Sequence, residues 1–207
     1  MNARHTPGLG TRLRARAATL RHYHEVSGVG DLVRRYVALN AFDGVLTTLG
    51  ILAGGYLGGV ESPRTLLMVG LATAAAMAVS GFYGSYLVEK AERGRAMREL
   101  EESTLSSLDD TEIASASRYA TIVIALADGG SPAVAAAVAF APFVFAEAIG
   151  MTAAYAAGVG IAFVECFALG VFLGRVSRGR LVLSGLKLVV AGLVLLLISL
   201  LLDRGVT

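Results

Sequence analysis

The sequence has few of the residues on which small disulfide-bonded and zinc-binding folds depend. Its 207 residues include one cysteine and no tryptophan, and only 16% are charged. A single cysteine excludes a disulfide scaffold and a cysteine-rich zinc fold. An average soluble domain has about 25% charged residues. The low charge, with 55% hydrophobic residues and a mean hydropathy of +0.66, therefore argues against a soluble enzyme, a disordered tail and a nucleic-acid-binding module.

Motifs of the common enzyme classes are absent as well. The sequence contains no P-loop, no HExxH, no GxSxG and no pair of intramembrane aspartates of the protease type. A pump driven by ATP would need a nucleotide-binding domain, which this chain lacks. We therefore expect neither an enzyme nor a tightly bound cofactor.

Five stretches are apolar and nearly free of charge, and a helix needs roughly 20 residues to cross a bilayer's hydrocarbon core. They comprise residues 37–60, 65–88, 131–150, 148–174 and 181–202. We predict an all-α membrane protein with five transmembrane helices. We also predict a cytoplasmic helical insertion between spans two and three.

The insertion, residues 89–118, has a helix-forming composition with a polar break near residues 104–110. It is expected to be a helical hairpin that continues span two. Residues 119–127 are apolar but too short to span, and could add a third helix under the membrane. The following Asp-Gly-Gly-Ser-Pro segment, residues 128–132, predicts a helix stop and a new start.

The chain accordingly divides into four parts. These are a basic arm with a juxtamembrane helix from residue 22 to 35 (1–36), spans one and two (37–88), an acidic helical insertion (89–130) and spans three to five (131–207).

Basic residues indicate the orientation. Of the 18 Lys and Arg residues, all but Arg64 and Arg204 lie in the arm, in the insertion or around the loop between spans four and five. Lys187 is included because it can snorkel to that side. The positive-inside rule then predicts a cytoplasmic N-terminus and an external C-terminus. Residues 1–36 are Arg-rich with no apolar segment, so we expect no signal peptide, and we assign the protein to a prokaryotic plasma membrane.

Asp43 lies inside the first predicted span, where an ionisable group is costly and is therefore a functional candidate. At helical spacing it shares a face with Thr47, Gly50 and Gly54. Glycines on such a face allow a second helix to approach closely. The alternative is an interfacial helix cap, because Asp43 lies only about two turns into the span.

Met77 lies in the middle of the second predicted span, on a face with Gly81 and Gly84. With a facing Asp43 and Thr47, its soft sulfur would join hard oxygen ligands. Such a mixture suits Fe²⁺ better than Mg²⁺ or Ca²⁺. These three residues are our candidate transport pore, and hydrophobic packing of Met77 is the alternative.

The insertion also carries a stripe of four glutamates at intervals of three, seven and three residues: Glu89, Glu92, Glu99 and Glu102. On a helix they fall within about 140° of the circumference, so together they could collect divalent cations. The alternative is a solvated helix with the ion pairs Glu89–Arg93 and Arg95–Glu99.

Glu165 lies near the middle of the fourth predicted span. An acid at this depth can carry protons, or it can be a protonated group that is hydrogen-bonded to a neighbouring helix. Both interpretations stay open.

Residues 40–54 (NAFDGVLTTLGILAG) resemble the first-span signature of the vacuolar iron transporter family, Asn/Asp-Gly-x-x-(Thr/Ser)-Thr-x₅-Gly. Residues 76–79 are similar to its span-two Met motif, and the acidic hairpin lies where the family has its metal-binding domain. Many relatives have Gly-Glu-Tyr after that Met. This chain has Ser-Gly-Phe-Tyr at 80–83 and lacks that carboxylate.

The resemblance implies a five-span homodimer that moves Fe²⁺, or Mn²⁺, out of the cytoplasm in exchange for protons. Asp43 and Met77 would then be pore ligands, and the glutamate stripe would collect metal. Its partners would be membrane lipid, divalent ions, protons and a second copy. We therefore expect a secondary transporter. Two alternatives are a non-transporting metal sensor or buffer that uses the hairpin, and a transporter of another solute that relies on Glu165.

Overall fold

The computed structural model describes the backbone of residues 9–206 and the side chains of residues 18–205. This part of the chain is helical and contains no strand. The helices are α1 (Leu9–Ser27), α2 (Gly30–Leu57), α3 (Pro63–Thr104), α4 (Glu112–Phe140), η1 (Ala141–Phe145), α5 (Ala146–Ile149), α6 (Met151–Val176) and α7 (Leu181–Val206). The all-α prediction is confirmed.

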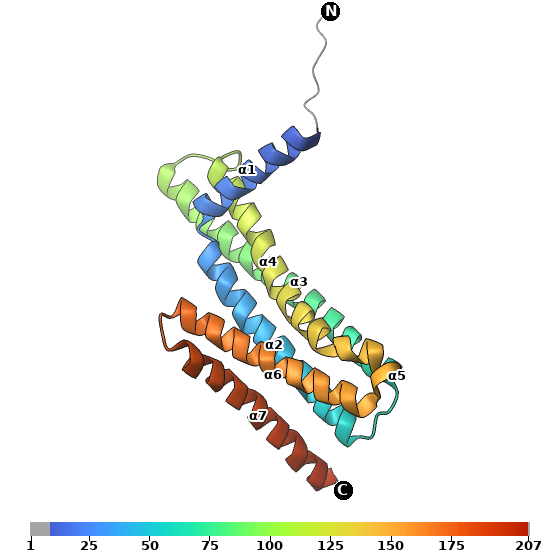
Figure 1. The fold of residues 1–207 in the computed structure, drawn as a ribbon. Coiled ribbons are helices and arrows are strands. Elements are labelled where there is room, and N and C mark those ends of the chain that lie inside the picture. Colours follow the sequence, from blue (N-terminus) through green and yellow to red (C-terminus); the bar gives the residue numbers. More distant parts are fainter. Residues whose placement is uncertain (1–8, 207) are drawn as a thin grey trace, which may run out of the picture.

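Within the described residues, five helical segments are long and apolar enough to cross a membrane, as predicted. They correspond to α2, α3, α4 with its short continuation to Ile149, α6 and α7. Figure 1 shows α3 and α4 running side by side, with α2 against them and α6 and α7 on the other side of α2. Apolar residues remain exposed along α7, among them Leu193, Leu197 and Leu201. Such a surface is suited to lipid.

α2 occupies the centre of the bundle. Val45, Leu49 and Leu52 on this helix are fully buried. Two clusters share it: one joins α2 to α3, α4 and α6 around Phe140, and the other joins it to α4, α6 and α7 around Cys166. The central helix is therefore the one that carries Asp43.

α3 and α4 form a long hairpin with a turn at residues 105–111. The turn is held by Glu101, whose carboxylate accepts the Leu108 amide at 2.7 Å. Thr111 caps α4 by accepting the Ala114 amide through its hydroxyl oxygen at 3.3 Å. The predicted hairpin and its break are thus present, and α3 continues span two without interruption.

The predicted helix stop at residues 128–132 is wrong. α4 runs unbroken through this segment and keeps Pro132 inside it. Gly129 allows α4 to pack closely against α3, because a Cβ at this position would lie 2.3 Å from the carbonyl oxygen of Ala78. Likewise, a Cβ on Gly44 of α2 would lie 2.5 Å from the carbonyl oxygen of Pro132. Small residues at such crossings stabilise membrane helix pairs, and an exposed break in the backbone would be costly in hydrocarbon. Residues 119–127 are consequently part of α4 and do not form a separate helix.

The N-terminal region also differs from the prediction. One helix, α1, extends from Leu9 to Ser27, and α2 already begins at Gly30. The expected juxtamembrane helix from 22 to 35 is therefore interrupted at Gly28, which adopts φ +60°. That conformation costs glycine little. Residues 1–8 of the expected arm lie outside the described residues.

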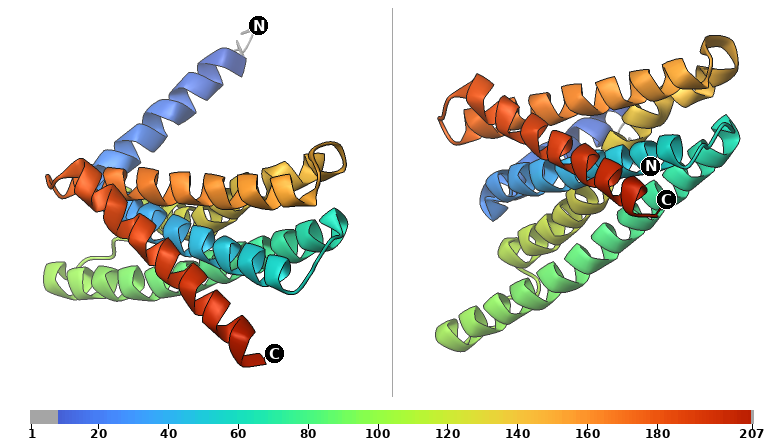
Figure 2. Two further views of the ribbon diagram at one scale, coloured as in Figure 1. Left: turned by 60° about the horizontal axis from the view of Figure 1, so that its bottom comes forward. Right: turned by 90° about the horizontal axis from the view of Figure 1, so that it is seen from below.

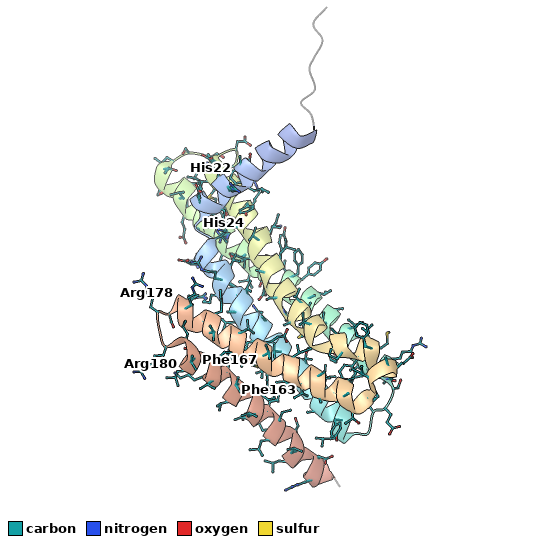
Figure 3. The ribbon with its side chains drawn as sticks, in the orientation of Figure 1. His22, His24, Phe163, Phe167, Arg178 and Arg180 are labelled. Carbon is teal, nitrogen blue, oxygen red and sulfur yellow. The ribbon has the colours of Figure 1, made fainter. Side chains whose placement is uncertain are left out.

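α6 and α7 pack through glycines. A Cβ on Gly185 would lie 2.6 Å from the ring of Phe167, and one on Gly192 would lie 3.0 Å from that of Phe163. Figure 3 shows both phenylalanines near α7, and the basic loop with Arg178 and Arg180 at one end of the pair. The two additional views in Figure 2 show α7 crossing the bundle obliquely.

Candidate functional site

Asp43 lies near the middle of the 28-residue α2. The side chain is exposed in the single chain. On the same face, a Cβ added to Gly50 or Gly54 would meet no atom within 4 Å. The helix begins at Gly30, with Val29 at the cap position, so the alternative that Asp43 caps the helix is wrong. The acid and the glycines form an open, narrow face.

The two threonines after Asp43 have different environments. Thr48 is fully buried and donates its hydroxyl to the carbonyl oxygen of Gly44 at 2.9 Å. Thr47 is half-buried at the edge of the open face. Of the two, Thr47 is therefore the threonine with an accessible side chain.

Met77 is half-buried on α3 and packs against the cluster around Phe140. Two contacts between α2 and α3 show how far along the bundle Met77 lies. At one end, Asn40 of α2 and Ser85 of α3 both donate hydrogen bonds to Asp128. At the other end, Gly55 of α2 lies against Leu66 of α3. Met77 and Thr47 both lie between these contacts along their antiparallel helices. In the single chain, packing accounts for the contacts of Met77.

The glutamates of the hairpin have unequal surroundings. Glu89 is only 5% exposed, and its carboxylate accepts Arg93 Nε at 2.9 Å. Glu99 accepts Arg95 Nε at 2.8 Å. Both predicted ion pairs are confirmed. The other two members of the stripe, Glu92 and Glu102, are exposed.

No preformed metal cage is present in the described part of the chain. Among the residues with described side chains, no three His, Cys, Asp or Glu residues come close enough to hold a metal ion. Asp43 therefore has no cluster of such side chains around it in the described part of a single chain.

Glu165 lines a groove of about 420 Å³ between α2, α4 and α6. The other lining residues are apolar or small, among them Val37, Val134 and Leu169. One carboxylate oxygen, Oε2, is buried and has no hydrogen-bond partner among the described residues. The predicted hydrogen bond to a neighbouring helix is thus not seen at this atom.

Sequence reasoning missed a polar junction of three helices. Asp128 of α4 accepts hydrogen bonds from Asn40 of α2 through Oδ1 and from Ser85 of α3 through Oδ2. Asn40 Nδ2 also donates to the Tyr36 carbonyl oxygen at 2.9 Å. The interpretation of residues 128–132 as a loop concealed this acid. The apolar residues on both sides of Asp128 were the signal that a single membrane helix contains it.

Comparison with known proteins gives one informative relative. The chain is 28% identical to the uncharacterized protein MJ0645 of Methanocaldococcus jannaschii over 179 residues, which is 85% of this chain and 91% of that protein. No family model matches the chain, and no solved structure matches it significantly. The similarity therefore extends along most of the length of both proteins.

Proposed function

We propose that the protein is a divalent metal/proton antiporter, similar to the vacuolar iron transporters, that moves Fe²⁺ or Mn²⁺ out of the cytoplasm. The observation that carries this proposal is Asp43, an exposed carboxylate on an open glycine face of a membrane helix. A charged group facing lipid is costly, so such groups normally face a partner or a water-filled path. A second copy packed on the same face would provide both.

A homodimer across α2 supplies the ligands that one chain lacks. Two copies of Asp43 would face each other, with Thr47 half-buried beside each and Met77 at a similar depth on α3. Carboxylate and hydroxyl oxygens with a thioether suit a borderline ion such as Fe²⁺. The open positions at Gly50 and Gly54 support the close approach of two α2 backbones.

Exchange follows from the chemistry of a carboxylate. Metal ligands must be deprotonated, so binding of a proton and binding of a metal at Asp43 exclude each other. Acid on the far side of the membrane would therefore release the metal there. Glu165, with a buried oxygen that lacks a partner, is the candidate for an additional proton carrier.

The hairpin would collect metal before it enters the pore. Glu89 and Glu99 already hold arginines, so this role falls first on Glu92 and Glu102, which are exposed and form no ion pair among the described residues. The distribution of Lys and Arg supports a cytoplasmic location of the hairpin and of the N-terminus, with the C-terminus external. The host membrane that we propose is a prokaryotic plasma membrane.

Flux measurements test the proposal. The purified protein in liposomes with a pH gradient should transport Fe²⁺ or Mn²⁺, followed by quenching of an enclosed metal-sensitive dye. Asp43→Asn should lower the flux by at least about tenfold, the loss typical of a disturbed metal site. Glu61→Gln, in the loop between α2 and α3, is the matched control and should transport normally. Equal flux in Asp43→Asn and the native protein would refute the proposal, and metal binding without flux would favour a sensor or buffer.

A second candidate function is supported by the Glu165 groove. An acid in an otherwise apolar groove of this size can bind a proton or a cationic solute. If the protein transports another solute, Glu165→Gln should abolish transport in a substrate screen, and Asp43→Asn should leave it unchanged. The opposite pattern would exclude this candidate.

A further inference from the structure

An open cavity of about 480 Å³ lies between α3 and α4 of the hairpin. Four basic residues line it: Lys90, Arg93 and Arg98 from α3, and Arg118 from α4. Its distinctive property is therefore positive charge, on a hairpin that was predicted to be acidic.

The acidic residues at this cavity are outnumbered by the basic ones, two to four. Only Glu101 and Asp109 line it, and the carboxylate of Glu101 is engaged with the Leu108 amide at the hairpin turn. Arg93 is already paired with Glu89. The other three cations of the cavity are Lys90, Arg98 and Arg118.

These three cations have only neutral contacts. Lys90 Nζ lies 5.7 Å from the ring centre of Tyr86, and Arg118 Nη2 donates to the hydroxyl of Ser115 at 3.3 Å. Among the side chains that the structure describes, Arg98 and these two form no ion pair within 4.0 Å. Hydroxyl groups of Ser117 and Thr121 complete the wall.

The cavity lies where the apolar surface of the hairpin ends. Leu87 and Val88 are exposed on α3 just before Lys90, and Ile122 and Leu126 are exposed on α4 just after Arg118. The uncharged stretch 65–88 of α3 ends at the same level. Phospholipid phosphates lie at this boundary in a bilayer, with acyl chains beside the apolar residues.

We propose that this cavity binds a phosphate group, and its place at the membrane boundary favours the headgroup of an anionic phospholipid over a soluble phosphate. Guanidinium groups bind phosphate oxygens in a bidentate manner, and Lys90 adds a point charge. The volume accommodates a phosphorylated headgroup. This site is independent of Asp43 and of metal transport.

Lipid binding by the full-length protein tests the inference. Native mass spectrometry would measure binding of phosphatidylglycerol, with phosphatidylcholine as the reference, to protein released from detergent micelles. Equilibrium dialysis with radiolabelled inorganic phosphate forms the second arm. Arg98→Gln/Arg118→Gln removes two charges from the cavity. Arg175→Gln/Arg180→Gln removes two from the loop between α6 and α7 and is the matched control.

Phosphatidylglycerol should bind more tightly than phosphatidylcholine, and Arg98→Gln/Arg118→Gln should weaken it at least tenfold while the loop variant does not. If inorganic phosphate alone binds with the same dependence, the phosphate site stands and its source is soluble. The proposal would be overturned if both double variants weakened the binding of phosphatidylglycerol equally. It would also be overturned if phosphatidylglycerol bound no more tightly than phosphatidylcholine and inorganic phosphate did not bind. Lys90→Gln is a milder variant that decides the question if the double variant fails to fold.

Discussion

The crossing of α2 and α4 allows a sharp test of the packing in this fold. A Cβ added at Gly44 would lie 2.5 Å from the carbonyl oxygen of Pro132 and 2.6 Å from its Cα. Carbon atoms in ordinary contact are ~3.5–4.0 Å apart, so Gly44→Ala must separate two helix backbones by about 1 Å. Neither side offers a flexible side chain that could move instead.

The expected cost follows from this geometry. Overpacking typically destabilises by about 1–3 kcal/mol, and two rigid backbones favour the upper end. Replacing glycine by alanine in a helix recovers roughly 1 kcal/mol of propensity. We therefore expect a net loss of about 2 kcal/mol in the free energy of unfolding.

Gly84→Ala is the matched control, because a Cβ at this exposed position of α3 would meet no atom within 4 Å. It gains the same propensity without the clash, so the two variants should differ by about 3 kcal/mol. The measurement is unfolding in dodecylmaltoside micelles by added SDS, followed by circular dichroism. Equal stability of the two variants, within about 0.5 kcal/mol, would refute the close contact of α2 with α4.

Three further predictions concern the dimer, the hairpin turn and the polar junction. In a Cys166→Ala background, Gly54→Cys should form a disulfide-linked dimer in membranes and Gly160→Cys on α6 should not. The reverse result on non-reducing gels would place the interface elsewhere. Leu105→Gly should raise the free energy of unfolding by about 1 kcal/mol, because the exposed Leu105 has φ +51°; an unchanged SDS midpoint would contradict this. Asp128→Ala should lower stability by about 2–4 kcal/mol, since it removes the acceptor of two hydrogen bonds, whereas native-like unfolding would show that the junction is not formed.

The membrane fold was largely predictable, because one physical requirement dominates it. A span must be long, apolar and internally hydrogen-bonded, and composition alone reveals such segments. The hairpin turn was predictable because residues 104–110 are rich in Ser, Thr and Asp, which favour turns and helix caps over helix interiors. The prediction of a helix stop at residues 128–132 was wrong because the turn propensities of Gly and Pro describe proteins in water. In a membrane bundle those residues permit close packing.

The candidate site was predictable only in part. The open face of Asp43 followed from helical spacing, and so did the ion pairs Glu89–Arg93 and Arg95–Glu99. The burial of Glu89 did not, because it depends on how the other helices pack against α3. The basic cavity was hidden for the same reason: Arg118 is distant in sequence from Lys90, and only the hairpin brings them to one wall.

The sequence by itself determined the class of protein, the number of long apolar segments and the helix face that Asp43 shares with Thr47, Gly50 and Gly54. These depend on local composition and on the fixed period of a helix. Only the tertiary structure decided which residues lie together. Asp128 binds Asn40 and Ser85, Gly44 lies against Pro132, and Arg118 of α4 lines the same cavity as the basic residues of α3. Such partnerships depend on how helices cross, and the crossings are set by close contacts between small residues that no local pattern specifies.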